Sequence, residues 1–338
     1  MQSIIRIDSQ ESNSIMASIC IVGAGAVGGF IAARVAKAGH TVNVLARGKT
    51  LEALQAHGIT LIDRDGRASY PVHAEADPAR LGVQDIVIIT VKAPALADLA
   101  ERLTPLIGSA TVIVPAMNGV PWWFFERPGP LSGQRLQTVD PDGRIARALP
   151  ASQVIGGVVH LSASSPEPGV VQHAFGDKLI LGAPAGGPDP RVDRVADLLQ
   201  QGLEVERSAA IQRDVWFKLW GNMTMSPVSV LTGATCDRIL DDPLVYRFCL
   251  DVMAEASRIG AAIGCPIAQS GEDRSQVTRK LGAFKTSMLQ DAEAGRTLEI
   301  DALVASVREI GERVDIRTPN LDALLGLVRL HAQTHGLA

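Results

Sequence analysis

Cysteine is scarce in this chain of 338 residues, and the few cysteines present are scattered. The sequence contains four, Cys20, Cys236, Cys249 and Cys265, with no CxxC pair and no histidine at ligand spacing. This pattern indicates neither a zinc site nor a disulfide framework. The expected compartment is therefore a reducing cytosol.

The chain also lacks a strong excess of either charge and any long apolar run. Its 32 Lys and Arg oppose 36 Asp and Glu, mixed along the whole length, so no basic face for nucleic acid is expected. No run of about 18 apolar residues suggests a membrane span. The leading segment "MQSIIRIDSQESNSIMAS" has no signal-peptide core; we expect residues 1–16 to be a disordered tail, with Met16 a candidate start. A small-molecule partner is the remaining expectation.

The length favours two domains, and the first half alternates short apolar runs with helical patterns. Strands are predicted in "SICIVG", "TVNVLA", "DIVIITVK" and "ATVIVPAMNG", and helices near 27–38, 49–57 and 95–103. Near-continuous β-branched runs separated by helices are typical of a parallel sheet covered on both faces. The fold class is thus α/β, a Rossmann-type doubly wound sheet.

The pattern changes twice further along the chain. From about Val154, runs joined by Gly and Pro suggest antiparallel strands that extend the sheet, followed by a helix near 190–201 and a last strand, "LEVERS". Beyond it the periodicity is helical, with continuous helices expected over 243–264 and 271–294. We predict an NADP-binding domain over 17–206 and an all-α substrate and catalytic domain over 207–338.

A glycine motif follows the first predicted strand and opens the first predicted helix. Gly23 permits the tight turn, Gly25 removes a side chain where a pyrophosphate approaches, and Gly28 lets helix and sheet pack closely. The helix amino end then faces the phosphates with its positive dipole. The predicted cofactor loop comprises Gly23, Ala24, Gly25, Ala26, Val27 and Gly28.

Charged and polar residues follow the later strands, where ligands of open sheets bind. Arg47, with Lys49 close behind, stands where NAD enzymes usually carry an acidic residue, which favours the 2′-phosphate of NADP over NAD. Ordinary charges entering a helix are the alternative. Lys92 in "TVKAPA" and Asn118 in "AMNG" face the same crevice or serve as capping or turn residues.

Lys218 lies in a strongly apolar predicted helix, "DVWFKLWGN". Ketone reduction needs a proton donor opposite the hydride donor, and none of the seven histidines has a helical Asp partner nearby. Asn222 follows Lys218 by four residues and shares its face of the helix. From periodicity alone, a snorkelling lysine is favoured over one held for catalysis.

At this point the sequence resembles the ketopantoate reductase (2-dehydropantoate 2-reductase) family from about Ile19 to His331. The matching words include "GAGAVGG", "TVKA", "MNGV", "DVWFKLWGN", "SPVSVLTGAT" and, most specifically, "TSMLQDAEAGRTLEID". The resemblance implies a Rossmann domain, a helical domain of the 6-phosphogluconate dehydrogenase type, NADPH, and reduction of a 2-keto acid to a 2-hydroxy acid.

The resemblance also assigns roles to individual residues. Lys218 would polarise and protonate the keto oxygen, and Glu299, which would also border the cofactor, would pair with and orient Lys218. Asn222 and Ser287 would hold the hydroxyl and carboxylate ends of the substrate. Lys92 and Asn118 would lie where the nicotinamide ribose and the substrate meet.

Two positions depart from the family pattern. Ser226, before Pro227, replaces a usual asparagine that would help bind substrate, and Phe284 stands where polar residues can face it. These changes leave the oxidoreductase class intact and allow a second hypothesis, a reductase of another branched or bulkier 2-keto acid. A third hypothesis is a non-catalytic NADP-binding sensor, against which the intact Lys218 and Glu299 argue. Amphipathic helices near the carboxyl end favour a homodimer.

Overall fold

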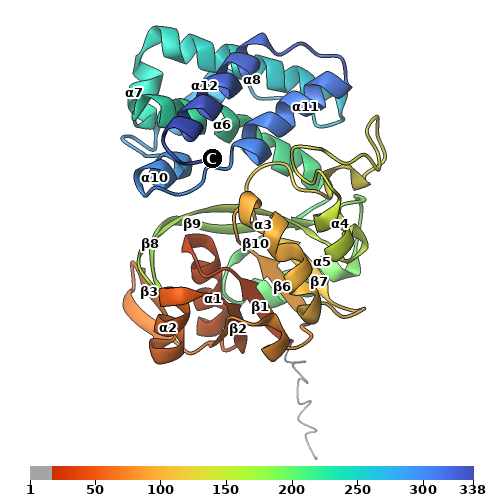
Figure 1. Cartoon of the computed structure of the whole chain (residues 1–338), viewed down its shortest axis with the longest axis vertical. Helices are drawn as coiled ribbons and strands as arrows, with labels where there is room; N and C mark the ends of the chain where they lie inside the picture. Colours follow the sequence, from red (N-terminus) through yellow and green to blue (C-terminus); the bar gives the residue numbers. More distant parts are fainter. Residues whose placement is uncertain (1–16) are drawn as a thin grey trace, which may run out of the picture.

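The structure is a computed structural model that describes residues 17–338, so the predicted tail over residues 1–16 and the candidate start at Met16 lie outside the described residues. An α/β half, red to green in Figure 1, lies below a helical half, cyan to blue. The last strand, β10 (Glu204–Ser208), ends just before the first helix of the helical half, α6 (Ile211–Thr232). We propose residues 17–206 and 207–338 as the two domains.

The first sheet is fully parallel, with the strand order β5-β2-β1-β6-β7. Successive side chains of β1 serve opposite faces: Ile19 and Ile21 join one apolar core, Cys20 and Val22 another. The doubly wound prediction is confirmed, although β5 was not predicted. The strands are β1 (Ile19–Val22), β2 (Val42–Leu45), β5 (His73–Glu75), β6 (Ile86–Ile89) and β7 (Val112–Pro115).

Helices cover this sheet, and further short helices precede the second half. The α-helices of this half are α1 (Ala26–Lys37), α2 (Gly48–His57), α3 (Ala93–Leu99), α4 (Arg144–Ala148) and α5 (Pro190–Leu199). The 3-10 helices are η1 (Pro78–Arg80), η2 (Ala100–Leu106), η3 (Phe124–Glu126) and η4 (Ala151–Gln153).

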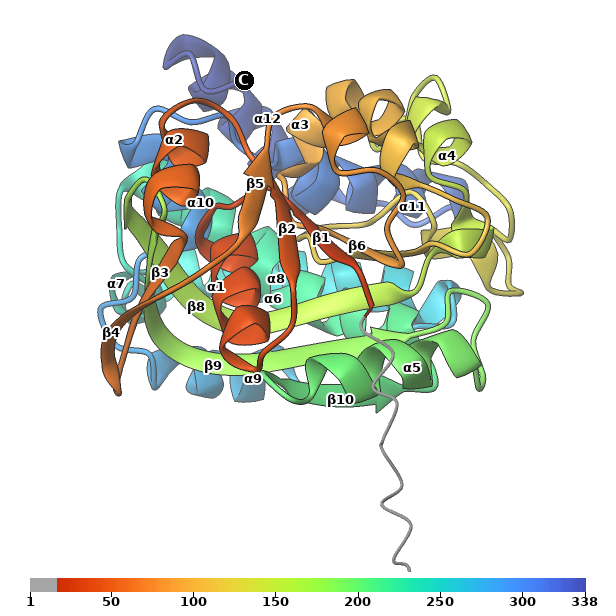
Figure 2. The same cartoon turned by 90° about the horizontal axis from the view of Figure 1, so that it is seen from below.

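The expectation that later strands extend the first sheet is wrong. Instead β8 (Gly156–Glu167) and β9 (Val170–Gly182) form a long antiparallel ribbon, and β9 also pairs with β3 (Ile59–Asp63) and β10. β4 (Gly66–Tyr70) pairs with β3. Helix α1 packs on β8 and β9, so the ribbon lies across the helical layer, as Figure 2 shows. Just before β8, Val154 bridges to Ile113 of β7.

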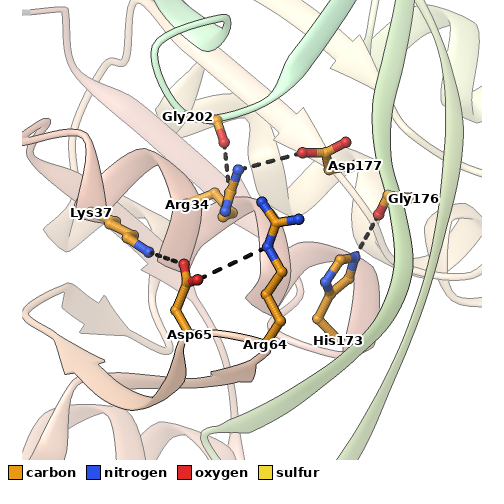
Figure 3. A network of polar contacts seen from close by, with 8 residues as sticks. All are labelled: Arg34, Lys37, Arg64, Asp65, His173, Gly176, Asp177 and Gly202. Carbon is orange, nitrogen blue, oxygen red and sulfur yellow. Dashed lines mark hydrogen bonds and ion pairs between the residues drawn. The ribbon is translucent and has the colours of Figure 1, made fainter.

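Polar contacts fix α1 against this second sheet (Figure 3). Arg34 of α1 donates from Nε to the carbonyl of Gly202 at 2.6 Å and reaches Asp177 of β9 at 3.4 Å. Lys37 pairs with Asp65, in the β3–β4 turn, at 3.3 Å. These bonds hold the helix that carries the glycine loop at its amino end.

The helical half is built around α6, but the predicted continuous helix over 271–294 is wrong. Gly282 adopts a left-handed φ of +63° after α9, and Thr286 starts a new helix by accepting the Leu289 N–H at 3.2 Å. The helices are α7 (Cys236–Asp241), α8 (Pro243–Ala262), α9 (Gly271–Arg279), α10 (Ser287–Glu293), the π-helical turn η5 (Asp301–Ala305), α11 (Ser306–Arg313) and α12 (Pro319–Thr334).

The apolar cores do not follow the boundary between the halves. One core joins Val22 and Ile89 of the first sheet, Trp123, and Trp216 and Met223 of α6. The cleft between the halves is therefore backed by a continuous packed interior. Among residues 17–338, no helix combines the length and the apolar character needed to cross a bilayer.

Candidate active site

The glycine loop leaves β1 and enters α1 as predicted. Gly23 has a φ of +96° and donates its N–H to the Leu45 carbonyl at 3.0 Å. A Cβ on Gly28 would overlap the Gly23 carbonyl and the Thr90 hydroxyl, so close packing requires this glycine. A Cβ on Gly25, by contrast, would meet nothing within 4 Å. Packing within the protein therefore does not require glycine at position 25, whereas the close approach of a pyrophosphate would require it.

Arg47 lies at the carboxyl end of β2 as the residue before α2. Arg47 and nearby Lys49 are exposed, and neither forms an ion pair within residues 17–338. Their charges are thus free for an anion at the edge of the glycine loop. A guanidinium suits a phosphate because its planar donors bind two oxygens together.

Lys218 does not snorkel into water. Its ammonium, on α6, donates to the Val159 carbonyl of β8 at 2.6 Å and thereby spans the two halves. Burial lowers the pKa of Lys218 to about 8, and the charge of Glu299 opposes that shift. An ammonium with this pKa is poised to give up a proton near neutral pH.

Glu299 is only 8% exposed and lies just before the π-helical turn. Its Oε1 accepts the Ala93 N–H at 3.2 Å. Burial raises the pKa of Glu299, whereas the Ala93 N–H, the Lys92 charge and the Asn118 side chain lower it. The structure differs from the direct pairing implied by the resemblance: within the described residues no ion pair of 4.0 Å or less joins Glu299 to Lys218, and they interact through charge alone.

Lys92 has a partner that sequence reasoning missed. It precedes α3 and forms an ion pair with Asp291 of α10, which also accepts a bond from Arg296 at 2.9 Å. Asp291 follows Ser287 by four residues in the "SMLQD" stretch, and this spacing was the available signal. The pair links the two halves beside Glu299.

The proposed substrate residues differ in accessibility. Asn222 is partly exposed one helical turn after Lys218, and Ser287 is exposed as the first residue of α10. Asn118 is partly exposed in the loop after β7. Ser226 is 5% exposed, so it packs inside the helical half. Phe284 is partly exposed and meets Phe175 of β9 edge-on, with ring centroids 6.1 Å apart.

A cavity of about 490 Å³ lies behind the Asn118 loop. Its wall includes Ala93, Asn118 and Val215 and is mostly apolar, but neither Lys218 nor Glu299 lines it. The cavity therefore lies beside Lys218 and Glu299 without including them.

Comparisons with known proteins identify the family. The profile of "Ketopantoate reductase PanE/ApbA" matches residues 19–186, and that of its C-terminal part matches residues 210–332. The chain belongs to the ketopantoate reductase family. A curated family relative, the 2-dehydropantoate 2-reductase of Mesorhizobium japonicum, is 41% identical over 94% of this chain and 98% of its own.

Solved structures agree with this family assignment. A protein of Ralstonia solanacearum MolK2, named a ketopantoate reductase provisionally, is 64% identical with a TM-score of 0.93, covering 96% of this chain and all of its own. D-mandelate dehydrogenase, solved with NADH and anilino(oxo)acetate, shares the fold at a TM-score of 0.81 and 18% identity, over 95% of this chain and 100% of its own. The family is one of oxidoreductases that use a nicotinamide cofactor.

Proposed function

We propose that this protein reduces 2-dehydropantoate (ketopantoate) to pantoate with NADPH, a step toward pantothenate. The observation that carries the proposal is the Lys218 ammonium, held against the Val159 carbonyl in the cleft of a chain of this family. Its lowered pKa suits a proton donor.

The chain offers a fitting cradle for the cofactor. Gly25 leaves open space at the amino end of α1, and Arg47 presents an unpaired guanidinium at the end of β2. The former would take the pyrophosphate and the latter the 2′-phosphate, which favours NADPH over NADH. When bound, the cofactor supplies the hydride that reduces the keto carbon.

The side chains of the cleft bind the substrate and donate the proton. Lys218 donates a hydrogen bond to the keto oxygen and transfers its proton there as the carbon is reduced, and water then reprotonates it. Glu299 stabilises the ammonium by its charge. Asn222, Ser287 and Asn118 hold the rest of the substrate. A positioned general acid contributes about 10²–10⁴ in rate.

The direct test follows nicotinamide absorbance after purified protein is mixed with NADPH and ketopantoate, with NADH and pyruvate as parallel controls. The expected result is rapid oxidation selective for NADPH and ketopantoate. Demonstrable NADPH binding without oxidation by any keto acid would instead support a non-catalytic sensor and overturn the proposal.

A bulkier 2-keto acid is the second candidate substrate. Phe284 and Phe175 form an aromatic pair between the loop before α10 and β9, and Ser226 is withdrawn into the interior. An apolar or aromatic side chain would pack against such rings. Comparing kcat/KM across straight, branched and aromatic 2-keto acids separates this candidate from ketopantoate.

We further propose a cytosolic homodimer. All four cysteine thiols are free and buried, as suits a reducing compartment. Leu327 and Leu330 of α12 are 57% and 59% exposed, an apolar surface that a second copy would cover. Light scattering of the wild type and of Leu330→Lys tests this, with a monomeric mass for wild type as the contrary result.

A further inference from the structure

Arg274 of α9 is a partly buried cation beside α6, and it has no ion-pair partner among residues 17–338. Its guanidinium lies 5.2 Å from the Phe217 ring centroid, and its Nε is buried with no hydrogen-bond partner. Burial lowers its pKa, with no carboxylate opposing the shift. The enclosed Nε–H lacks an acceptor, and a bound anion would supply one.

The guanidinium lies on the cleft side of α6. Phe217 and Gly221, which it contacts, belong to the same partly exposed stripe as Lys218 and Asn222. Phe217 and Gly221 precede Lys218 and Asn222 by one residue each. Because an α-helix turns by about 100° per residue, the two pairs lie on neighbouring sides of α6. Arg274 thus borders the residues assigned to the substrate.

His160 of β8 supports this position independently. Burial lowers the pKa of His160 to about 4, and the charges of Lys218 and Arg274 are the next contributions. Two cations from different helices, α6 and α9, therefore approach the same residue of the opposite half. Lys178 acts on His160 in the same direction, and Glu206 opposes these cations.

The other cations near β8 either form ion pairs or have a proposed role. Lys92 pairs with Asp291, and Lys178 pairs with Glu204 and Glu206 at 3.2 and 3.0 Å. Lys218 is assigned to the keto oxygen under the proposed function. A 2-oxo acid also brings a carboxylate, and among the described residues of this side Arg274 is the cation left for it.

We propose that Arg274 binds the carboxylate of the 2-oxo acid substrate, an inference that rests on the proposed function. A guanidinium can donate two parallel hydrogen bonds to the two oxygens of a carboxylate and carries a positive charge. The amide of Asn222 and the hydroxyl of Ser287 carry no charge. Gly221 leaves room for the guanidinium, because a Cβ at this position would lie 3.1 Å from Nε of Arg274.

The test compares ketopantoate with its neutral lactone as substrates of wild type and Arg274→Gln. The KM for ketopantoate is expected to rise about 10- to 100-fold, as for loss of a hydrogen bond to a charged group, and the KM for the lactone to stay unchanged. Arg274→Lys should recover part of the loss. Arg247→Gln, at an exposed residue of α8 that pairs with Asp251, is the matched control and should keep wild-type constants.

Gly221→Ala provides a second variant that favours the helix and displaces only the guanidinium. It should raise the KM for ketopantoate about 3- to 10-fold without changing that for the lactone. Unchanged KM for ketopantoate in both variants, or an equal rise for both substrates, overturns the inference. So does weaker NADPH binding by fluorescence titration with unchanged KM, which would assign Arg274 to the cofactor. A wild type inactive with ketopantoate overturns the proposed function instead.

Discussion

The glycine loop and the catalytic cleft are built in opposite ways. The loop takes its geometry from residues within one β-α-β unit. Gly23 adopts a positive φ there, and Gly28 leaves room for the Gly23 carbonyl. The cleft joins Lys218 to a carbonyl of β8, and Glu299 to the N–H of the first residue of α3. Under the proposed function, cofactor binding is thus a property of one half, whereas proton transfer depends on how both halves pack.

The largest expected effect separates these two regions. Lys218→Ala removes the proton donor, so kcat should fall about 10²-fold or more, while NADPH affinity stays within about twofold because the loop is untouched. Steady-state kinetics and fluorescence titration measure the two. Lys280→Ala, an exposed lysine beyond α9, is the control. Near-normal turnover in Lys218→Ala would contradict the mechanism.

Two glycines of the loop are expected to differ in role, one in packing and the other in cofactor binding. Gly28→Ala forces a Cβ onto the Gly23 carbonyl, so thermal unfolding should show a loss of about 1–3 kcal/mol or more. Gly25→Ala meets no protein atom, so its melting temperature should match wild type while NADPH affinity falls about tenfold. Equal melting temperatures for both variants would contradict the packing role of Gly28.

The Arg47 guanidinium should set cofactor choice without affecting the cleft. Arg47→Ala is expected to lower the NADPH-to-NADH ratio of kcat/KM about tenfold, because one charge-assisted contact to the 2′-phosphate is lost. Kinetics with each cofactor at saturating keto acid give the ratio. An unchanged ratio would return Arg47 to the role of an ordinary loop charge.

The smallest effect concerns the support of Glu299 from the chain terminus. The Leu337 carbonyl accepts the Leu298 N–H at 3.0 Å, directly before Glu299. Deleting residues 336–338 frees that N–H and removes the buried Leu337 side chain, so kcat should fall about 2- to 5-fold and the melting temperature should also fall. Turnover equal to wild type would show that Glu299 is held by the Ala93 N–H alone.

Four strands of the first sheet, the glycine loop and the position of Arg47 followed from sequence because apolar periodicity and glycine spacing are local signals. Exposed β4 lacks an apolar face, and it was missed for that reason. The partners of Lys218 and Glu299 escaped prediction because Val159 and Ala93 contribute backbone groups, which every residue carries. The roles of all the site residues remain predictions, those of Lys218 and Glu299 included.

The most direct test of the proton-donor role is the dependence of kcat on pH in the wild-type enzyme with NADPH and ketopantoate. Lys218 must be protonated to act as the acid, and burial lowers its pKa to about 8. Activity should therefore be full below that pH and fall tenfold per unit above it. A kcat that stays constant well above pH 8, with the protein folded, would contradict the assignment of Lys218 as the proton donor.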